Sequence, residues 1–295
     1  MSEYLQSAES FDFGNIASEQ QIAAQGFQKR EFCSSNAQDC ISYYVGRPLA
    51  SKKLKYQTEL DSGSTTTEVT LDISREDVIE VTPATIVLVH GFRASKEFML
   101  NTALYFRFLG YNVIVPDLLG HGESSGAKAF GVGDSHIINE LINKEHISEQ
   151  PLYLLGNSMG AVAATHIAKM RNDVAGIILQ APMIDFDQAV LRYANANHPY
   201  LHRIMGDTSI LEGALSALTD ANLTVADTNI LPILSTLSIP TLILASSQDP
   251  VAPFASFADL QSNTITVEDL PNRNHPSMAI VGDDSSEIIL KWLKH

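Results

Sequence analysis

Short apolar runs alternate with amphipathic stretches from residue 84 onward, and this alternation restricts the fold more than any other feature. Residues 84–90 form a continuous apolar run, of the kind found in strands that are buried on both faces of a sheet. Residues 95–110 then carry apolar side chains at three- and four-residue spacing and reach Gly110, a typical helix stop. Repeated strand and helix pairs predict an α/β fold, with a mostly parallel central sheet and helices on both faces.

The same pattern locates the other elements. Further strands are expected at residues 111–117, 151–156, 174–182, 241–246 and 263–270, and helices at residues 134–146, 159–170 and 285–295. Residues 41–80 contain β-like runs that are broken by a turn at residues 61–65. These runs suggest antiparallel strands at one edge of the sheet.

The alternation is interrupted between Pro182 and about Ser238, where only helix-like pieces occur. An insertion of this length far exceeds an ordinary loop and is typical of a functional lid. We therefore predict three parts, namely an N-terminal extension at residues 1–40, an α/β core at residues 41–182 and 238–295, and a short helical cap at residues 183–237.

The charge of the chain excludes some partners. Acidic residues outnumber basic ones by 34 to 19, so a nucleic-acid partner is not expected. No run reaches the roughly 18 apolar residues of a membrane helix, so stable membrane insertion is not expected either. The first ten residues do not resemble a signal peptide, but a removed signal would leave no trace. Cytoplasmic, periplasmic and secreted locations stay open, as does the oligomeric state.

The two cysteines, Cys33 and Cys40, lie in one short polar stretch. We interpret them as free thiols, with a small disulfide loop as the alternative. A metal site is not expected, because no histidine or second cysteine pair lies nearby at ligand spacing.

Ser158 stands in a G-x-S-x-G pattern with Gly156 and Gly160, between an expected strand and an expected helix. A serine at such a turn adopts a strained backbone, and its glycine neighbours let the strand and the helix approach each other. The turn lifts the hydroxyl above the strand ends. Ser158 is therefore the candidate nucleophile, and an ordinary glycine turn is the alternative.

A serine hydroxyl needs a base, and the base needs an orienting acid. His275 follows the last expected strand, and Asp249 follows the strand before it, so both belong at the same sheet edge as Ser158. Their order along the chain is nucleophile, acid, base, as the motif requires.

Acyl transfer also needs donors for a developing oxyanion. The backbone N–H of Met159, directly after the nucleophile, is one candidate. The N–H of Phe92 is the other, because Gly91 lets the chain turn sharply after the strand at residues 84–90.

Other candidates are assigned lesser roles. His90, Asp117 and His121 are expected to shape turns near the site. Helical surface or packing positions are expected for His136, His146 and His166, substrate contact is considered for His198 and His202, and the fallback acids are Asp185 and Asp187.

Taken together, these motifs resemble the α/β-hydrolase superfamily. The motifs that carry the resemblance occur in the expected order, namely HGF at 90–92, DLLGHGES at 117–124, GNSMG at 156–160, SSQDPVAP at 246–253 and NRNH at 272–275. The chain is similar to the branch of monoacylglycerol lipases and serine aminopeptidases over roughly residues 50–295. The resemblance implies a Ser158, His275 and Asp249 triad, an oxyanion hole at Phe92 and Met159, and no metal or organic cofactor.

The expected cap is rich in apolar residues, of which some can line an acyl pocket. We therefore favour a small-molecule carboxylic ester as the substrate, with a short to medium acyl chain or an acylglycerol-like form. An aminopeptidase or amidase of the same fold is the first alternative. A non-catalytic binding protein of this fold is the second.

Overall fold

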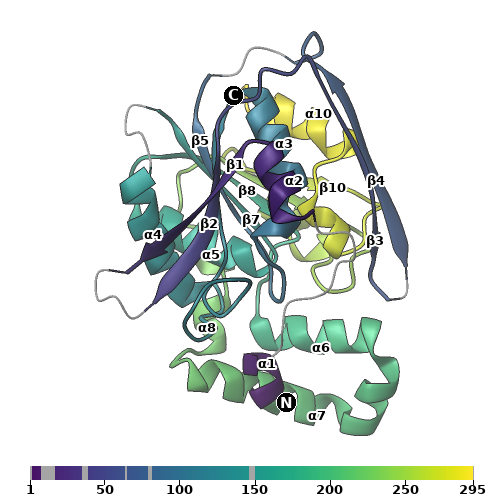
Figure 1. Cartoon of the computed structure of the whole chain (residues 1–295). Coiled ribbons are helices and arrows are strands. Elements are labelled where there is room, and N and C mark those ends of the chain that lie inside the picture. Colours follow the sequence, from purple (N-terminus) through teal and green to yellow (C-terminus); the bar gives the residue numbers. More distant parts are fainter. Residues whose placement is uncertain are drawn as a thin grey trace.

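Eight strands form the central sheet of the computed structural model, which describes residues 2–7, 17–34, 39–63, 65–78, 82–145 and 150–294. The strands lie in the order β1-β2-β6-β5-β7-β8-β9-β10 (Figure 1). Their bounds are β1 (Phe27–Cys33), β2 (Cys40–Gly46), β5 (Thr85–Val89), β6 (Asn112–Pro116), β7 (Leu152–Asn157), β8 (Val174–Gln180), β9 (Thr241–Ala245) and β10 (Ile265–Asp269). Strands β6 to β10 pair in parallel, whereas β1 and β2 are antiparallel to their neighbours.

Helices cover both faces of this sheet, as the alternating pattern predicts. The helices α4 (Val132–Glu145) and α5 (Met159–Met170) pack together on one face, and α3 (Leu100–Leu109) and α10 (Asp283–Trp292) lie on the other (Figure 1). All five residues of β5 are buried, because a central parallel strand is covered on both sides. The predicted α/β fold with a mostly parallel sheet is confirmed.

Two of the strands expected at the sheet edge form a separate hairpin instead. The strands β3 (Lys53–Asp61) and β4 (Thr66–Ser74) pair only with each other among the described strands, and they contact α3 and α10 (Figure 1). Only β2 of the runs in residues 41–80 joins the sheet, so the edge-strand prediction is wrong for the other two. Alternating exposure along both strands gives the same sequence pattern for a hairpin that lies on helices as for an edge strand.

The predicted boundary at residue 40 also differs from the structure. The strand β1, preceded by α2 (Glu19–Ala24), is the edge strand of the central sheet. Its middle four residues are exposed, so it lacks the apolar signature that marks a strand in a sequence. Residues 27–33 therefore belong to the core rather than to an extension.

Cys33 and Cys40 are joined in a disulfide, and the interpretation as free thiols is not supported. The two residues face each other across β1 and β2, which brings their side chains together. The bond ties the edge strand to its neighbour at the end of both strands.

Helices alone connect β8 to β9, and they gather at one end of the molecule (Figure 1). We call residues 183–237 the cap segment. Its helices are α6 (Phe186–Asn197), α7 (Pro199–Asp220), α8 (Val225–Thr228) and α9 (Leu231–Leu234), and α7 is kinked at Gly206. The short helix α1 (Ser2–Ser7) packs against α7, far from the strand that follows it in sequence (Figure 1). Within the described ranges, no helix has both the length and the apolar character needed to cross a bilayer.

Candidate active site

Ser158 occupies a strained turn between β7 and α5. Its φ of 50° and ψ of -114° lie in a region that side chains other than glycine rarely adopt. A side chain at Gly156 would collide with the Gly160 carbonyl, and one at Gly160 would collide with the Val89 carbonyl. The two glycines therefore let α5 approach the sheet closely. Strain of about 1–3 kcal/mol at one residue persists only where the surroundings enforce it, and such residues cluster at functional sites.

His275 links Ser158 to Asp249 in one chain of hydrogen bonds. The His275 Nε2 atom lies 3.0 Å from Ser158 Oγ, and its Nδ1 atom lies 2.6 Å from Asp249 Oδ2. The other carboxylate oxygen of Asp249 accepts the N–H groups of Val251 (2.8 Å) and Ala252 (3.1 Å). The acid is buried, so its position is fixed on both sides. With Nδ1–H donated to Asp249, the Nε2 lone pair faces the serine hydroxyl, as a general base requires.

The two predicted oxyanion donors lie on either side of this serine. Met159 is the first residue of α5, and N–H groups in the first turn of a helix have no acceptor within it. On the other side, a side chain at Gly91 would come within 3.1 Å of Ser158 Cβ, so the loop that carries Phe92 lies against the serine. The role of these N–H groups depends on a bound substrate and stays a prediction.

The Phe92 ring is held by aromatic neighbours, which fixes the loop. Its centroid lies 5.8 Å from those of His121 and Phe186, and 6.4 Å from that of Phe130. Phe186 is the first residue of α6 in the cap segment, so this contact joins the loop after β5 to the cap segment.

Behind that loop lies a second group of polar side chains, which we call the buried polar cluster: His90, Lys96, Asp117 and His121, with the half-exposed Glu123 at its edge. Lys96 Nζ contacts Asp117 Oδ2 at 2.7 Å and Glu123 Oε2 at 2.8 Å. Asp117 also accepts the backbone N–H groups of Lys96 and Glu123. The cluster therefore joins the start of η1 (Lys96–Met99) to the turn after β6.

Both histidines of the buried polar cluster contact backbone groups through their ring nitrogens. His90 Nε2 accepts the Leu118 N–H at 3.0 Å, and its Nδ1 lies 2.8 Å from the Gly91 carbonyl. His121 Nδ1 lies 2.9 Å from the Leu119 carbonyl, while its Nε2 has no hydrogen-bond partner among the described residues. Burial lowers the pKa of His90 to about 4 and that of His121 to about 3, so both are neutral near pH 7.

The remaining candidate residues are not part of the hydrogen-bonded chain of Asp249, His275 and Ser158. Asp185 accepts a bond from Asn229 within the cap segment, and His166 contacts the Asp227 carbonyl. Asp187 accepts from its neighbour Gln188, and His136 is exposed. His146 and the side chain of His202 lie outside the described residues.

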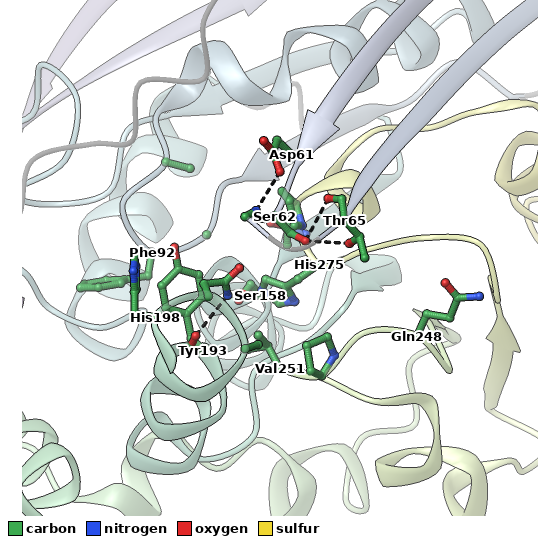
Figure 2. Close-up of a pocket in the computed structure, with 18 of the residues that line it drawn as sticks. Asp61, Ser62, Thr65, Phe92, Ser158, Tyr193, His198, Gln248, Val251 and His275 are labelled. Carbon is green, nitrogen blue, oxygen red and sulfur yellow. Dashed lines mark hydrogen bonds between the residues drawn. The ribbon is translucent and has the colours of Figure 1, made fainter. Parts of the chain in front are cut away.

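Two cavities open on Ser158 and His275. The hairpin lobe, of about 290 Å³, runs toward the β3–β4 turn; the cap lobe, of about 270 Å³, runs beneath α6. Residues that line both are Phe92, Ser158, Tyr193, His198, Val251 and His275. In Figure 2 Ser158 and His275 lie between the hairpin residues above and Tyr193 and His198 of the cap at the lower left.

The two lobes differ in chemistry. The hairpin lobe is lined largely by apolar groups such as Phe98 and Pro250, but it also offers polar groups that the cap lobe lacks, namely Asp61, Ser62, Thr65, Asn197 and Gln248. Apart from Arg93, the residues found only in the cap lobe are apolar, namely Leu5, Met183, Phe186, Ala189, Val190 and Ala194. An apolar chain and a polar group can thus occupy opposite sides of the same serine.

Sequence reasoning missed several residues that line these lobes. The β3–β4 turn is tied to the loop of His275 by Asn274, whose Nδ2 donates to the carbonyls of Leu60 (2.9 Å) and Thr65 (3.0 Å). No local pattern connects residues so far apart in sequence. Tyr193 could have been found, because it lies one helical turn from Val190 and Asn197 on one face of α6.

Comparison with known proteins places this geometry in context. A family model described as serine aminopeptidase, S33, matches residues 81–220. The chain is 29% identical to phospholipase YtpA of Bacillus subtilis (strain 168) over 34% of its length and 41% of that protein. It is 28% identical to lysophosphatidylserine lipase ABHD12 of Danio rerio over 57% of its length and 44% of that protein. The matched part spans less than half the length of these curated relatives.

A solved structure extends the likeness to nearly the whole chain. The esterase Pf2001 of Pyrococcus furiosus superposes on 98% of this chain and 97% of its own, with a TM-score of 0.65. Sequence identity in that superposition is 14%, so the likeness concerns the fold alone.

Proposed function

Because the chain belongs to the α/β-hydrolase superfamily and has lipase- and esterase-like relatives, we propose that it is a serine hydrolase that cleaves carboxylic esters. The observation that carries the proposal is the unbroken chain of hydrogen bonds from Asp249 through His275 to Ser158 Oγ. A strained serine beside an imidazole that a carboxylate orients is the arrangement that activates a hydroxyl.

The proposed reaction has two steps. Ser158 Oγ attacks the ester carbonyl carbon while His275 Nε2 takes the hydroxyl proton, and the oxyanion accepts the N–H groups of Phe92 and Met159. The C–O bond breaks, the alcohol takes the proton from His275, and an acyl group remains on Ser158. Water then attacks the acyl carbon with His275 as the base, which frees the acid and restores the serine. Asp249 stabilises the imidazolium in both steps.

The two lobes support an assignment of the two parts of the ester. The acyl chain lies in the cap lobe, whose walls are mostly aliphatic and aromatic, with the charged Arg93 also among the lining residues. The alcohol lies in the hairpin lobe, where hydroxyl, amide and carboxylate groups offer hydrogen bonds. A cavity of about 270 Å³ is near the lower end of the ~300–1,000 Å³ range of ligand pockets, which favours a short to medium acyl chain.

A matched pair of substrates tests the proposal. We expect the protein to hydrolyse p-nitrophenyl butyrate and to leave butyryl p-nitroanilide and leucine p-nitroanilide nearly intact, with all turnover lost in Ser158→Ala. Faster cleavage of leucine p-nitroanilide than of the ester would favour the aminopeptidase alternative. Ester cleavage that survives in Ser158→Ala would overturn the site assignment.

A further inference from the structure

The cap lobe takes part of its wall from a segment that is remote in sequence from every other residue of the site. Leu5 of α1 lines this lobe together with Ser158 and with residues of α6. Only 4% of the Leu5 surface is exposed. The side chain therefore stands where the acyl chain of an ester would have to pass or end.

Three hydrogen bonds fasten α1 in this place. Gln6 Nε2 donates to the Ala217 carbonyl at 2.9 Å, and Ser2 Oγ donates to Asp220 Oδ2 at 2.7 Å. Both acceptors belong to α7. On the other side, Lys128 Nζ donates to the Gln6 carbonyl at 2.9 Å. The helix therefore bridges the cap segment and the loop after β6 in the core.

A helix of six residues is not stable in isolation, so α1 depends on these contacts and on the burial of Leu5. The neighbours of Leu5 in the lobe include Phe186, Val190 and Ala194, which recur at four-residue spacing on one face of α6. The Leu5 side chain thus completes an apolar surface whose remaining walls come from the cap.

We infer that Leu5 is a specificity-determining residue that limits the length of the acyl chain, an inference that rests on the ester-cleaving function proposed above. The fold supplies the reacting atoms, and α1 supplies one wall of the acyl pocket. A smaller side chain at this position lengthens the pocket, and a larger one shortens it.

The test compares three variants on a series of p-nitrophenyl esters from acetate to laurate. Leu5→Ala should raise kcat/KM for long esters relative to short ones by about tenfold, and Leu5→Phe should lower the same ratio by about tenfold, as expected for a few carbons in an apolar pocket. Ile22→Ala is the matched control, because Ile22 of α2 is equally buried but lines neither lobe. It should leave the ratio unchanged.

A second readout separates this inference from the proposed function. Alkyl fluorophosphonates of increasing chain length should label Ser158 of wild type and of both Leu5 variants, with rates that follow the same length dependence. Labelling at rates independent of residue 5, or an equal shift in Ile22→Ala, would overturn the role of Leu5 while leaving the serine hydrolase intact. No labelling of wild type by any reagent would instead overturn the proposed function. Leu5→Phe keeps an apolar anchor, so the test stands even if Leu5→Ala loosens α1.

Discussion

Two histidine–aspartate pairs, His275 with Asp249 and His90 with Asp117, lie near the loop after β5, and only the first has the geometry of a catalytic pair. His275 and Asp249 approach to 2.6 Å, whereas His90 Nε2 and Asp117 Oδ1 are 3.7 Å apart. The His275 side chain is 18% exposed to the pocket, while His90 and Asp117 are fully buried.

The difference lies in what the second ring nitrogen contacts. The His275 ring has one nitrogen on a carboxylate and the other on a hydroxyl. The His90 ring has both nitrogens on backbone groups, and Asp117 is paired with Lys96 instead. The same residue types therefore build a hydrogen-bonded chain to a serine at one position and a structural brace at the other. The two positions differ in their exposure to the pocket and in the group that faces the Nε2 atom of the histidine.

The largest loss of activity is expected when Ser158 or His275 is replaced. Ser158→Ala or His275→Ala should lower kcat on p-nitrophenyl butyrate by about 10⁶-fold, as in other triads, because each change removes one member of the hydrogen-bonded pair of nucleophile and base. Steady-state kinetics with thermal unfolding as the control for folding measures this. Retention of more than a small fraction of activity would place the chemistry elsewhere.

Replacement of the two aspartates, Asp249 and Asp117, should have very different effects on kcat. Asp249→Asn should lower kcat by about 10⁴-fold, because the amide donates to His275 Nδ1 and fixes the wrong tautomer. Asp117→Asn is the matched change in the buried polar cluster, and its kcat per folded molecule should be nearly that of wild type. Equal losses of kcat in the two variants would contradict different roles for Asp249 and Asp117.

Replacement of Lys96 in the buried polar cluster should lower the free energy of unfolding rather than the activity. Lys96→Met leaves the carboxylate of Asp117 buried without its cation, so we expect a loss of about 3–5 kcal/mol in the free energy of unfolding. Urea denaturation measures the loss, and the labelling rate of Ser158 in the folded variant should be unchanged. A variant of wild-type stability would mean that the ion pair does not brace the loop.

The smallest effect concerns pH. The pKa values of His90 and His121, lowered by burial to about 4 and about 3, lie below the value of about 6.5 in the unfolded chain. The unfolded chain therefore binds more protons below pH 6.5, and stability falls as the pH drops toward 4, by up to about 1.4 kcal/mol per pH unit for each histidine. His121→Asn should flatten this slope in urea denaturation between pH 6.5 and 4.5. An unchanged slope would contradict a neutral, buried His121.

The sequence allowed prediction where a signal is local. The buried strands, the glycine-flanked Ser158 and the order of Asp249 and His275 each depend on a few neighbouring residues, and the carboxyl ends of parallel strands lie at one edge. These features led to the fold, which is confirmed, and to the three side chains that the structure brings together.

The walls of the pocket could not be predicted in this way. Leu5 and the β3–β4 turn reach the site through contacts with segments about two hundred residues away. Neither has a periodicity or motif that encodes the partner. The edge strand β1 was not predicted for a related reason, because its exposed residues give no apolar pattern in the sequence. The arrangement of Ser158, Asp249 and His275 was thus predictable from the sequence, whereas the walls of the pocket required the structure.

The most direct test of the account is intact-mass labelling with a small fluorophosphonate, with wild type beside Ser158→Ala. We expect one phosphonyl adduct on wild type and none on the variant, because Ser158 Oγ has the oriented imidazole of His275 within hydrogen-bond distance. No adduct on wild type, or an adduct on both proteins, would contradict an activated serine at this turn.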